Sequence, residues 1–186
     1  MAERASLVRL EKEFDIRVDW RGFELHPETP SGGVELEKLF PGMMTPERKA
    51  LMQQFAASFG VRGMIQPTNL ANTRRALAVA EFARDQGQLD EYRRLTMDAY
   101  WKEGKDIENS DVLAALAGAS NLDPEKAVLA ADDPVYLNRV DAIGDEFRKV
   151  GAGGIPTFIF SREIIEGCQP YDVVAAAALR ANAKRR

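Results

Sequence analysis

The stretch GAGGIPTFIF, residues 151–160, decides the fold. Three of its first four residues are glycine, and Ile155, Pro156 and four residues typical of a buried strand follow. Glycine admits backbone conformations that are closed to other residues. Proline has no N–H for a strand interior, so it belongs at the first residue of a strand or at an edge. The local pattern leaves two alternatives open: a trans proline that begins a strand, or a cis-proline in a tight turn.

A second short strand is predicted immediately after this stretch. A turn at residues 161–163 leads to Ile164 and Ile165, whose β-branched side chains favour a strand. A terminal helix is then predicted from about Pro170 to Leu179. The C-terminal part of the chain therefore reads as strand, strand, helix.

The first 25 residues predict a helix and a strand. Leu7, Leu10 and Phe14 fall at positions i, i+3 and i+7, which is one face of a helix over about residues 2–14. Residues 16–25 then alternate apolar and polar side chains, which is typical of a strand. Two prolines and two glycines make residues 26–33 a loop.

From residue 34 to residue 150 the sequence predicts helices. Ser, Thr, Asp and Asn can accept a hydrogen bond from the first helical turn, and proline fits the first helical position. The predicted helices run from Thr45 to about Phe59, from Asn72 or Thr73 to Gly87, from Leu89 to Trp101, from a cap at Ser110–Asp111, from Asp123, and from Asp133 to about Val150.

This order of elements predicts one α/β unit with a helical insertion. Strands near both ends, with helices between them, place the two ends in one layered domain. We assign residues 1–32 and 151–186 to that discontinuous domain. Residues 33–150 form the predicted all-helical insertion domain.

Composition and charge exclude several classes of function. The chain is 45% hydrophobic and 29% charged, as in soluble globular proteins. Its net charge of −4 gives no reason to expect a nucleic-acid partner. No run approaches the ~18 apolar residues of a membrane span. The start, MAERASLVRLEKEF, lacks the apolar core of a signal peptide, so we expect a cytoplasmic protein without a membrane partner.

The sequence offers few groups for chemistry of its own. Cys168 is the only cysteine and His26 the only histidine, so neither an intramolecular disulfide nor a His-rich metal site is expected. Cys168 lies near a predicted helix start, where a thiolate is stabilised. We favour the plainer interpretation, a small side chain packed where a strand meets a helix. No cofactor-binding motif is present, and we predict no metal and no cofactor.

In element order and in residues, the chain resembles DsbA-like thioredoxin-fold proteins, most closely the FrnE-type branch. The likeness rests on VDWRGFELHPETP at residues 18–30, on the helical stretch from NTRRALAVAEF onward, and on VGAGGIPTFIF and EGCQPYDVVAAAAL near the end. It covers essentially the whole chain. The resemblance implies a thioredoxin-like fold with a helical insertion, and protein thiols or disulfides, or a small thiol, as partners.

The resemblance also implies a binding site. Ile155–Pro156 is expected to be a cis peptide facing the site, and the backbone here and at Thr157 is expected to pair with an extended substrate. By analogy, Asn72 and Thr73 begin a helix that faces the same cleft. The predicted substrate-binding residues are therefore Ile155, Pro156, Thr157, Asn72 and Thr73.

One departure from the family is large. The family's reactive part is a central first strand followed by a C-x-x-C motif at a helix start, and these 186 residues contain neither. We therefore predict no catalytic residue in this chain, and expect an incomplete or inactive oxidoreductase. Three explanations compete: a start site placed downstream of the natural one, an inactive relative, or a partner chain that completes the site. The two rows of unpaired backbone groups beside a missing central strand predict either a homodimer that fills the gap or a rearranged sheet, and we favour the homodimer.

Two other functions stay open at this point. One is a glutathione-dependent isomerase or transferase of the kappa type, similar to 2-hydroxychromene-2-carboxylate isomerase, whose fold uses a serine or cysteine at the same missing position. The other is a non-catalytic module that holds a peptide or small molecule beside the cis-proline. Whether the chain is an enzyme is therefore undecided from sequence, as are the substrate and the direction of the redox reaction.

Overall fold

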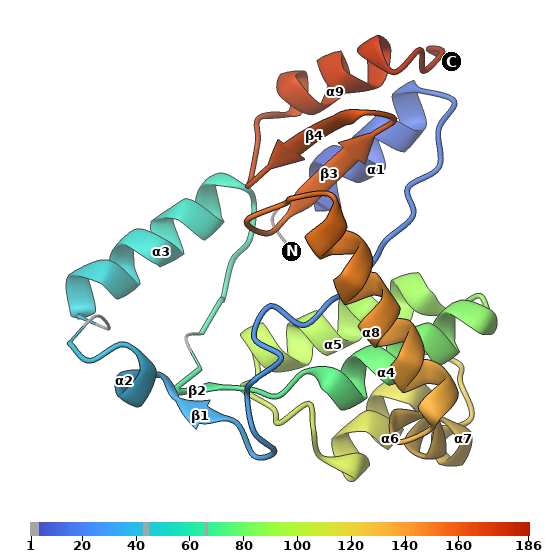
Figure 1. Ribbon diagram of the computed structural model, residues 1–186. Helices are drawn as coiled ribbons and strands as arrows, with labels where there is room; N and C mark the ends of the chain where they lie inside the picture. Colours follow the sequence, from blue (N-terminus) through green and yellow to red (C-terminus); the bar gives the residue numbers. More distant parts are fainter. Residues whose placement is uncertain (1–3, 43–44, 66) are drawn as a thin grey trace.

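The computed structural model describes residues 4–42, 45–65 and 67–186. The chain forms two packed bodies joined by a long helix (Figure 1). In chain order the elements are α1 (Arg4–Glu13), β1 (Val34–Glu35), α2 (Leu36–Leu39), α3 (Pro46–Ser58), β2 (Asn69–Leu70), α4 (Arg74–Asp85), α5 (Leu89–Trp101), α6 (Ser110–Ala119), α7 (Pro124–Ala131), α8 (Pro134–Lys149), β3 (Thr157–Phe160), β4 (Glu163–Glu166) and α9 (Tyr171–Arg180).

The first body joins the two ends of the chain. β3 and β4 form an antiparallel hairpin with Thr157 opposite Glu166 and Phe160 opposite Glu163. α1 and α9 pack beside this hairpin (Figure 1). Their shared core contains the buried side chains Leu7, Leu10, Phe14, Phe158, Val174, Ala175 and Ala178. The apolar face predicted over residues 2–14 is thus buried, within the part of that helix that the structure describes.

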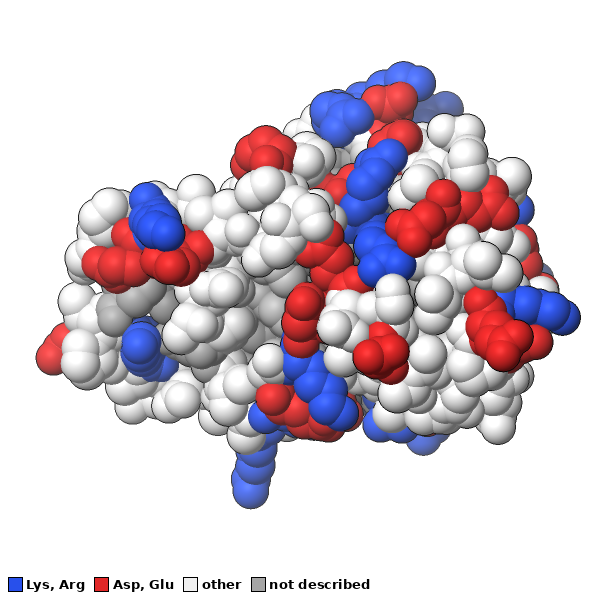
Figure 2. All heavy atoms as spheres, turned by 90° about the horizontal axis from the view of Figure 1, so that it is seen from below, with Lys and Arg blue, Asp and Glu red and all other residues white. Residues whose placement is uncertain are grey.

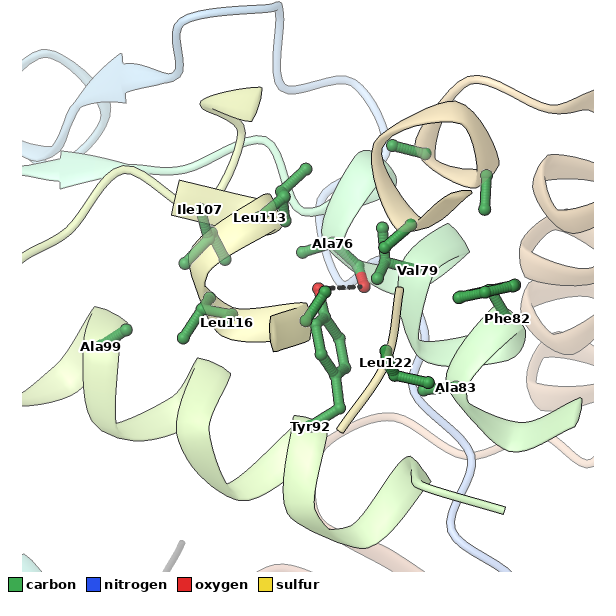
Figure 3. Packing of buried hydrophobic residues seen from close by; sticks show 14 residues of the cluster. Ala76, Val79, Phe82, Ala83, Tyr92, Ala99, Ile107, Leu113, Leu116 and Leu122 are labelled. Atoms are coloured by element: carbon green, nitrogen blue, oxygen red, sulfur yellow. Dashed lines mark hydrogen bonds between the residues drawn. The ribbon is translucent and has the colours of Figure 1, made fainter. Parts of the chain in front are cut away.

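The second body is a bundle built around α4. α5, α7 and α8 pack against α4, and α6 packs against α5 and α7. Tyr92 of α5 is fully buried at its centre, and its hydroxyl donates to the carbonyl oxygen of Ala76 across 3.4 Å (Figure 3). Removing this ring from water raises the pKa of Tyr92. The helical insertion expected from the sequence therefore has an apolar core of its own.

Most helix starts agree with the sequence. The side chains of Thr45, Asp123 and Asp133 accept hydrogen bonds from backbone N–H groups of the turns that follow them. For α6 the predicted cap was wrong. Asn109, and not Ser110, accepts from the next turn, at 2.8 Å and 3.3 Å. Ser110 is already the first residue of the helix.

The strand predicted for residues 16–25 is not formed among the described residues. A strand needs a neighbouring strand to hydrogen-bond with its backbone, and backbone groups of this segment bind side chains instead. Val18 N donates to the side chain of Glu11 at 3.0 Å, and the carbonyl oxygen of Trp20 accepts from Arg84. The alternation instead lets Ile16 and Trp20 pack against the α1–α9 core while charged side chains face outward.

The two short strands β1 and β2 were not predicted from the sequence. β1 and β2 pair over two residues each, within the region predicted to be helical only, and α2 follows β1 directly. They are too short to leave a periodic pattern. At the hairpin, Glu163 belongs to β4 and not to the turn. No helix over the described residues is both long and apolar enough to cross a membrane.

α8 positions the loop that the sequence singled out. This helix runs from the bundle toward the β3–β4 hairpin, and residues 150–156 connect the two (Figure 1). The fold thus places GAGGIP where the two bodies meet.

Candidate substrate-binding cleft

The loop at residues 151–156 is short and firmly tied to the hairpin. The Ile155–Pro156 peptide is cis, as the family resemblance implied. Gly151, at a φ of 72°, ends α8 in a conformation that favours glycine. Gly167 N donates to the carbonyl oxygen of Pro156 at 2.8 Å. The loop therefore holds a defined conformation at the start of β3.

Ile155 and Pro156 of this loop lie on a large cavity. The cavity holds about 1930 Å³ and lies between the hairpin, residues 15–23, α3 and α5. Sites for small molecules commonly measure about 300–1,000 Å³. The cavity is thus large enough for a segment of polypeptide.

Residues 15–23 form one wall, and two arginines of the bundle fix it. Arg84 binds Asp19 at 2.7 Å and also the carbonyl oxygen of Trp20. The guanidinium of Arg93 lies 3.7 Å from the centre of the Trp20 ring. Burial acts to raise the pKa of Asp19, but hydrogen bonds and charges from Arg21 and Arg84 outweigh it and lower that pKa. The Trp20 side of the cleft is therefore held in place by the helical bundle.

α3 forms another wall and turns apolar side chains to the cavity. Leu51, Met52 and Phe55 line it, and Leu51 and Phe55 are 66% and 57% exposed. No other helix or strand of the described chain packs extensively against α3. The cleft thus has an accessible apolar lining on this side.

Charges on the molecular surface are mixed in sign. On the face in Figure 2, Lys and Arg side chains are interspersed with Asp and Glu. Arg74, for example, lies between Glu24 and Asp141, at 2.8 Å and 2.7 Å. Charges of both signs therefore lie close together on this face.

The structure brings four of the five predicted binding residues to this cavity. Ile155, Pro156 and Thr157 line it beside one another, and Thr73 lines it from the start of α4. Asn72 is not among the described lining residues. Its side chain donates to the carbonyl oxygen of Thr29 at 2.8 Å and accepts from Arg74 N at 3.0 Å. Asn72 therefore anchors the 26–33 loop to the start of α4.

The single cysteine and the single histidine also line the cavity. Cys168 is half-buried in the bend between β4 and α9, three residues before α9 begins at Tyr171. The terminal helix thus starts next to Pro170, as predicted, and Cys168 lies just before it. His26 lies in a loop, with Nδ1 3.1 Å from a carboxylate oxygen of Glu28. Within the described ranges, no cluster of three or more His, Cys, Asp or Glu side chains could hold a metal ion.

Several cleft residues were not predicted. The apolar side chains of α3 belong to a helix with no clear periodic face, so no sequence pattern placed them at the site. Trp20 was assigned to a strand, and its contact with Arg93 joins positions 73 residues apart along the chain. A local sequence signal existed for residues 151–157, where glycines and a proline make the backbone unusual, and the family resemblance added Thr73.

Comparisons with known proteins agree with this architecture. A family model described as DSBA-like thioredoxin domain matches residues 2–178. The uncharacterised protein YwbO of Bacillus subtilis (strain 168) is 25% identical over 167 residues, which span 88% of this chain and 81% of that protein.

Solved structures show the same fold at low sequence identity. A probable DsbA oxidoreductase from Streptomyces coelicolor has a TM-score of 0.85 at 21% identity, covering 97% of this chain and 83% of that one. A 2-hydroxychromene-2-carboxylate isomerase has a TM-score of 0.74 at 17% identity, covering 96% of this chain and 88% of that one.

Proposed function

The chain belongs to the DSBA-like thioredoxin domain family, and from this premise we propose a FrnE-type role in thiol–disulfide chemistry. The cleft beside Ile155–Pro156 holds a thiol- or disulfide-bearing polypeptide segment. One observation carries this proposal: Ile155 is 55% exposed and lies, with Pro156 and Thr157, on a cavity of about 1930 Å³.

The geometry supports an extended partner. β3 pairs with β4 along one edge, and no other strand among the described residues pairs with it. An edge strand offers N–H and C=O groups to an added strand. Apolar side chains of α3 and of residues 15–23 line the cavity around the partner's side chains. Backbone pairing would provide affinity, and these walls would provide selectivity.

The redox step needs a second sulfur. Disulfide exchange proceeds by attack of a thiolate on a disulfide, and a second thiol resolves the mixed disulfide. The 186 residues contain one cysteine. We therefore expect them, by themselves, to bind a partner without reducing insulin catalytically. A reducing, cytoplasmic setting is part of the proposal, since such a chain is not stabilised by disulfides.

A second copy of the chain is proposed to complete the sheet. The four residues of β3 carry no charge, and Ile159 is 56% exposed. Natural edge strands usually carry charges, prolines or covers that prevent pairing. β3 lacks such protection, so in the absence of a partner segment its free edge would pair with the same edge of another copy, an isologous contact that the partner segment would displace.

An isomerase-type function is the alternative. It rests on the fold likeness to 2-hydroxychromene-2-carboxylate isomerase, and it implies that the cavity binds glutathione. The cavity volume of about 1930 Å³ exceeds the roughly 300–1,000 Å³ usual for small-molecule sites, which favours a polypeptide over glutathione as the bound partner. Binding measurements with both probes separate the two.

We propose titrating the chain into fluorescein-labelled, carboxymethylated insulin B chain, followed by fluorescence anisotropy, with glutathione binding measured by calorimetry. Ile155→Arg should weaken peptide binding about tenfold or more, since it places a charge in an apolar cleft. Leu129→Arg, at an exposed position of α7, is the matched control and should bind normally. Binding of glutathione but not of peptide would favour the isomerase, and equal affinity of both variants would contradict the assigned site.

A further inference from the structure

Two side chains that lie opposite each other in the hairpin bind the backbone of the glycine loop. Thr157 of β3 lies opposite Glu166 of β4 in the hairpin register. The Thr157 hydroxyl donates to the carbonyl oxygen of Gly154, and a Glu166 carboxylate oxygen accepts from Gly153 N, both at 2.5 Å. This pair of side chains, the Thr157–Glu166 clamp, thus binds the N–H of Gly153 and the carbonyl oxygen of Gly154, just before Ile155.

The loop needs such a clamp. Three glycines in four residues leave its backbone more conformational freedom than non-glycine residues would. Without anchors, Ile155 would be presented to the cleft in many orientations. A loop that already holds its bound conformation loses less conformational entropy on binding, so more of the contact energy contributes to affinity. The clamp therefore acts on the same loop that lines the cavity.

Glu166 has no competing task among the residues that the structure describes. No Lys, Arg or His side chain forms an ion pair with it there, whereas Glu163 on the same strand binds Arg180 at 2.5 Å. A Cβ added to Gly153 would lie 3.9 Å from both carboxylate oxygens of Glu166, so the carboxylate lies directly over that residue. A carboxylate that accepts from a backbone N–H forms one of the stronger hydrogen bonds in proteins.

We propose that Thr157 and Glu166 are positioning residues, which fix the 151–154 loop and so present the Ile155 backbone to a partner. The inference rests on the proposed function for the partner, but the clamp itself can be tested without one. Both residues act through the loop and not on the partner's sulfur.

Amide hydrogen exchange followed by NMR tests the clamp directly. Exchange at the Gly153 amide, which donates to Glu166, should accelerate about tenfold in Glu166→Ala, and exchange at the amides of this loop should accelerate to a smaller extent in Thr157→Val, which removes the donor to the Gly154 carbonyl oxygen. Glu166→Gln and Thr157→Ser retain hydrogen-bonding atoms at those positions, so their exchange should stay within about threefold of the original. Glu163→Ala, on the same strand, is the control and should leave these amides unchanged.

Unchanged exchange in Glu166→Ala, or equal acceleration in Glu166→Gln, would overturn the inference. Peptide binding adds a second measurement. The affinity for carboxymethylated insulin B chain should fall about tenfold in Glu166→Ala and recover in Glu166→Gln. If the original chain does not bind this peptide, the proposed function fails, while the exchange data still decide whether the clamp exists.

Discussion

At the scale of single residues, burial decides which side chains matter for stability. Tyr92 is the largest of the fully buried side chains described, and Phe14 follows it in the other core. Each fills the centre of one body. The apolar spacing of Leu7, Leu10 and Phe14 made the buried face of α1 predictable from sequence. No local pattern could show that Tyr92 is central and that Asn72 binds a loop 43 residues away.

Truncation of Tyr92 tests whether its buried ring stabilises the helical bundle. Tyr92→Ala should lower the free energy of unfolding by about 3–5 kcal/mol, because it leaves a large cavity in the bundle core. Tyr92→Phe should cost less than ~1 kcal/mol, since the hydroxyl's bond to Ala76 is long. Urea unfolding followed by circular dichroism measures both. Similar losses for the two variants would mean that the hydroxyl, and not the ring, carries the stability.

Acid sensitivity is expected at Asp141. Hydrogen bonds from Arg74, with its charge, lower the pKa of Asp141. A carboxyl group whose pKa is lower in the folded state stabilises that state above its unfolded pKa of about 4, and the stabilisation disappears as pH falls through the folded pKa. Since the Asp141 side chain is 54% exposed, the effect should be below about 1 kcal/mol.

Unfolding measured between about pH 5 and pH 2 checks this sign. Asp141→Asn should be less stable than the original chain above about pH 4, and the difference should shrink as the pH falls. If the difference in unfolding free energy between the two proteins stayed constant from about pH 5 to about pH 2, the role of the Arg74–Asp141 pair would be refuted.

At the scale of elements, helix starts were predictable and strand pairing was not. Capping side chains act within three residues of sequence, so Thr45, Asp123 and Asp133 could be identified directly. A strand depends on a neighbour that sequence does not reveal, and residues 16–25 bind side chains of α1 and α4 instead of another strand. The hairpin was predictable because its two strands are separated by a tight turn alone.

The cap of α6 provides a test at this scale. Asn109→Ala should destabilise the protein by about 1 kcal/mol, because its side chain accepts from two backbone N–H groups. Ser110→Ala should have less than half that effect, since Ser110 lies inside the helix and is not its cap. Thermal unfolding of the two variants compares them. A larger loss for Ser110→Ala would restore the cap first expected from sequence.

At the scale of the whole molecule, two bodies with separate cores meet at the 151–156 loop. The sequence resemblance predicted the thioredoxin-like fold, because its motifs span the chain from residue 18 to the last helix. The domain limits at residues 32 and 150 remain predictions. The α3 wall of the cleft arises only when distant segments pack together, so it could not be predicted.

Edge pairing belongs to this scale. If β3 pairs with the same strand of another copy, light scattering after size-exclusion chromatography should give twice the 20.6 kDa mass of one chain. Ile159→Lys should shift it to a monomer with unchanged circular dichroism, because a charge on an edge strand prevents pairing. A folded monomer in the unsubstituted chain would contradict the proposed dimer.

The central claim is that the cleft beside Ile155–Pro156 binds an extended polypeptide. The most direct measurement is NMR line broadening by carboxymethylated insulin B chain that carries a nitroxide spin label. The strongest broadening is expected at the amides of residues 153–159 and 16–22, and the amides of α6 and α7 should be unaffected. Broadening centred on α6 or α7, or none above the level of free nitroxide, would contradict it.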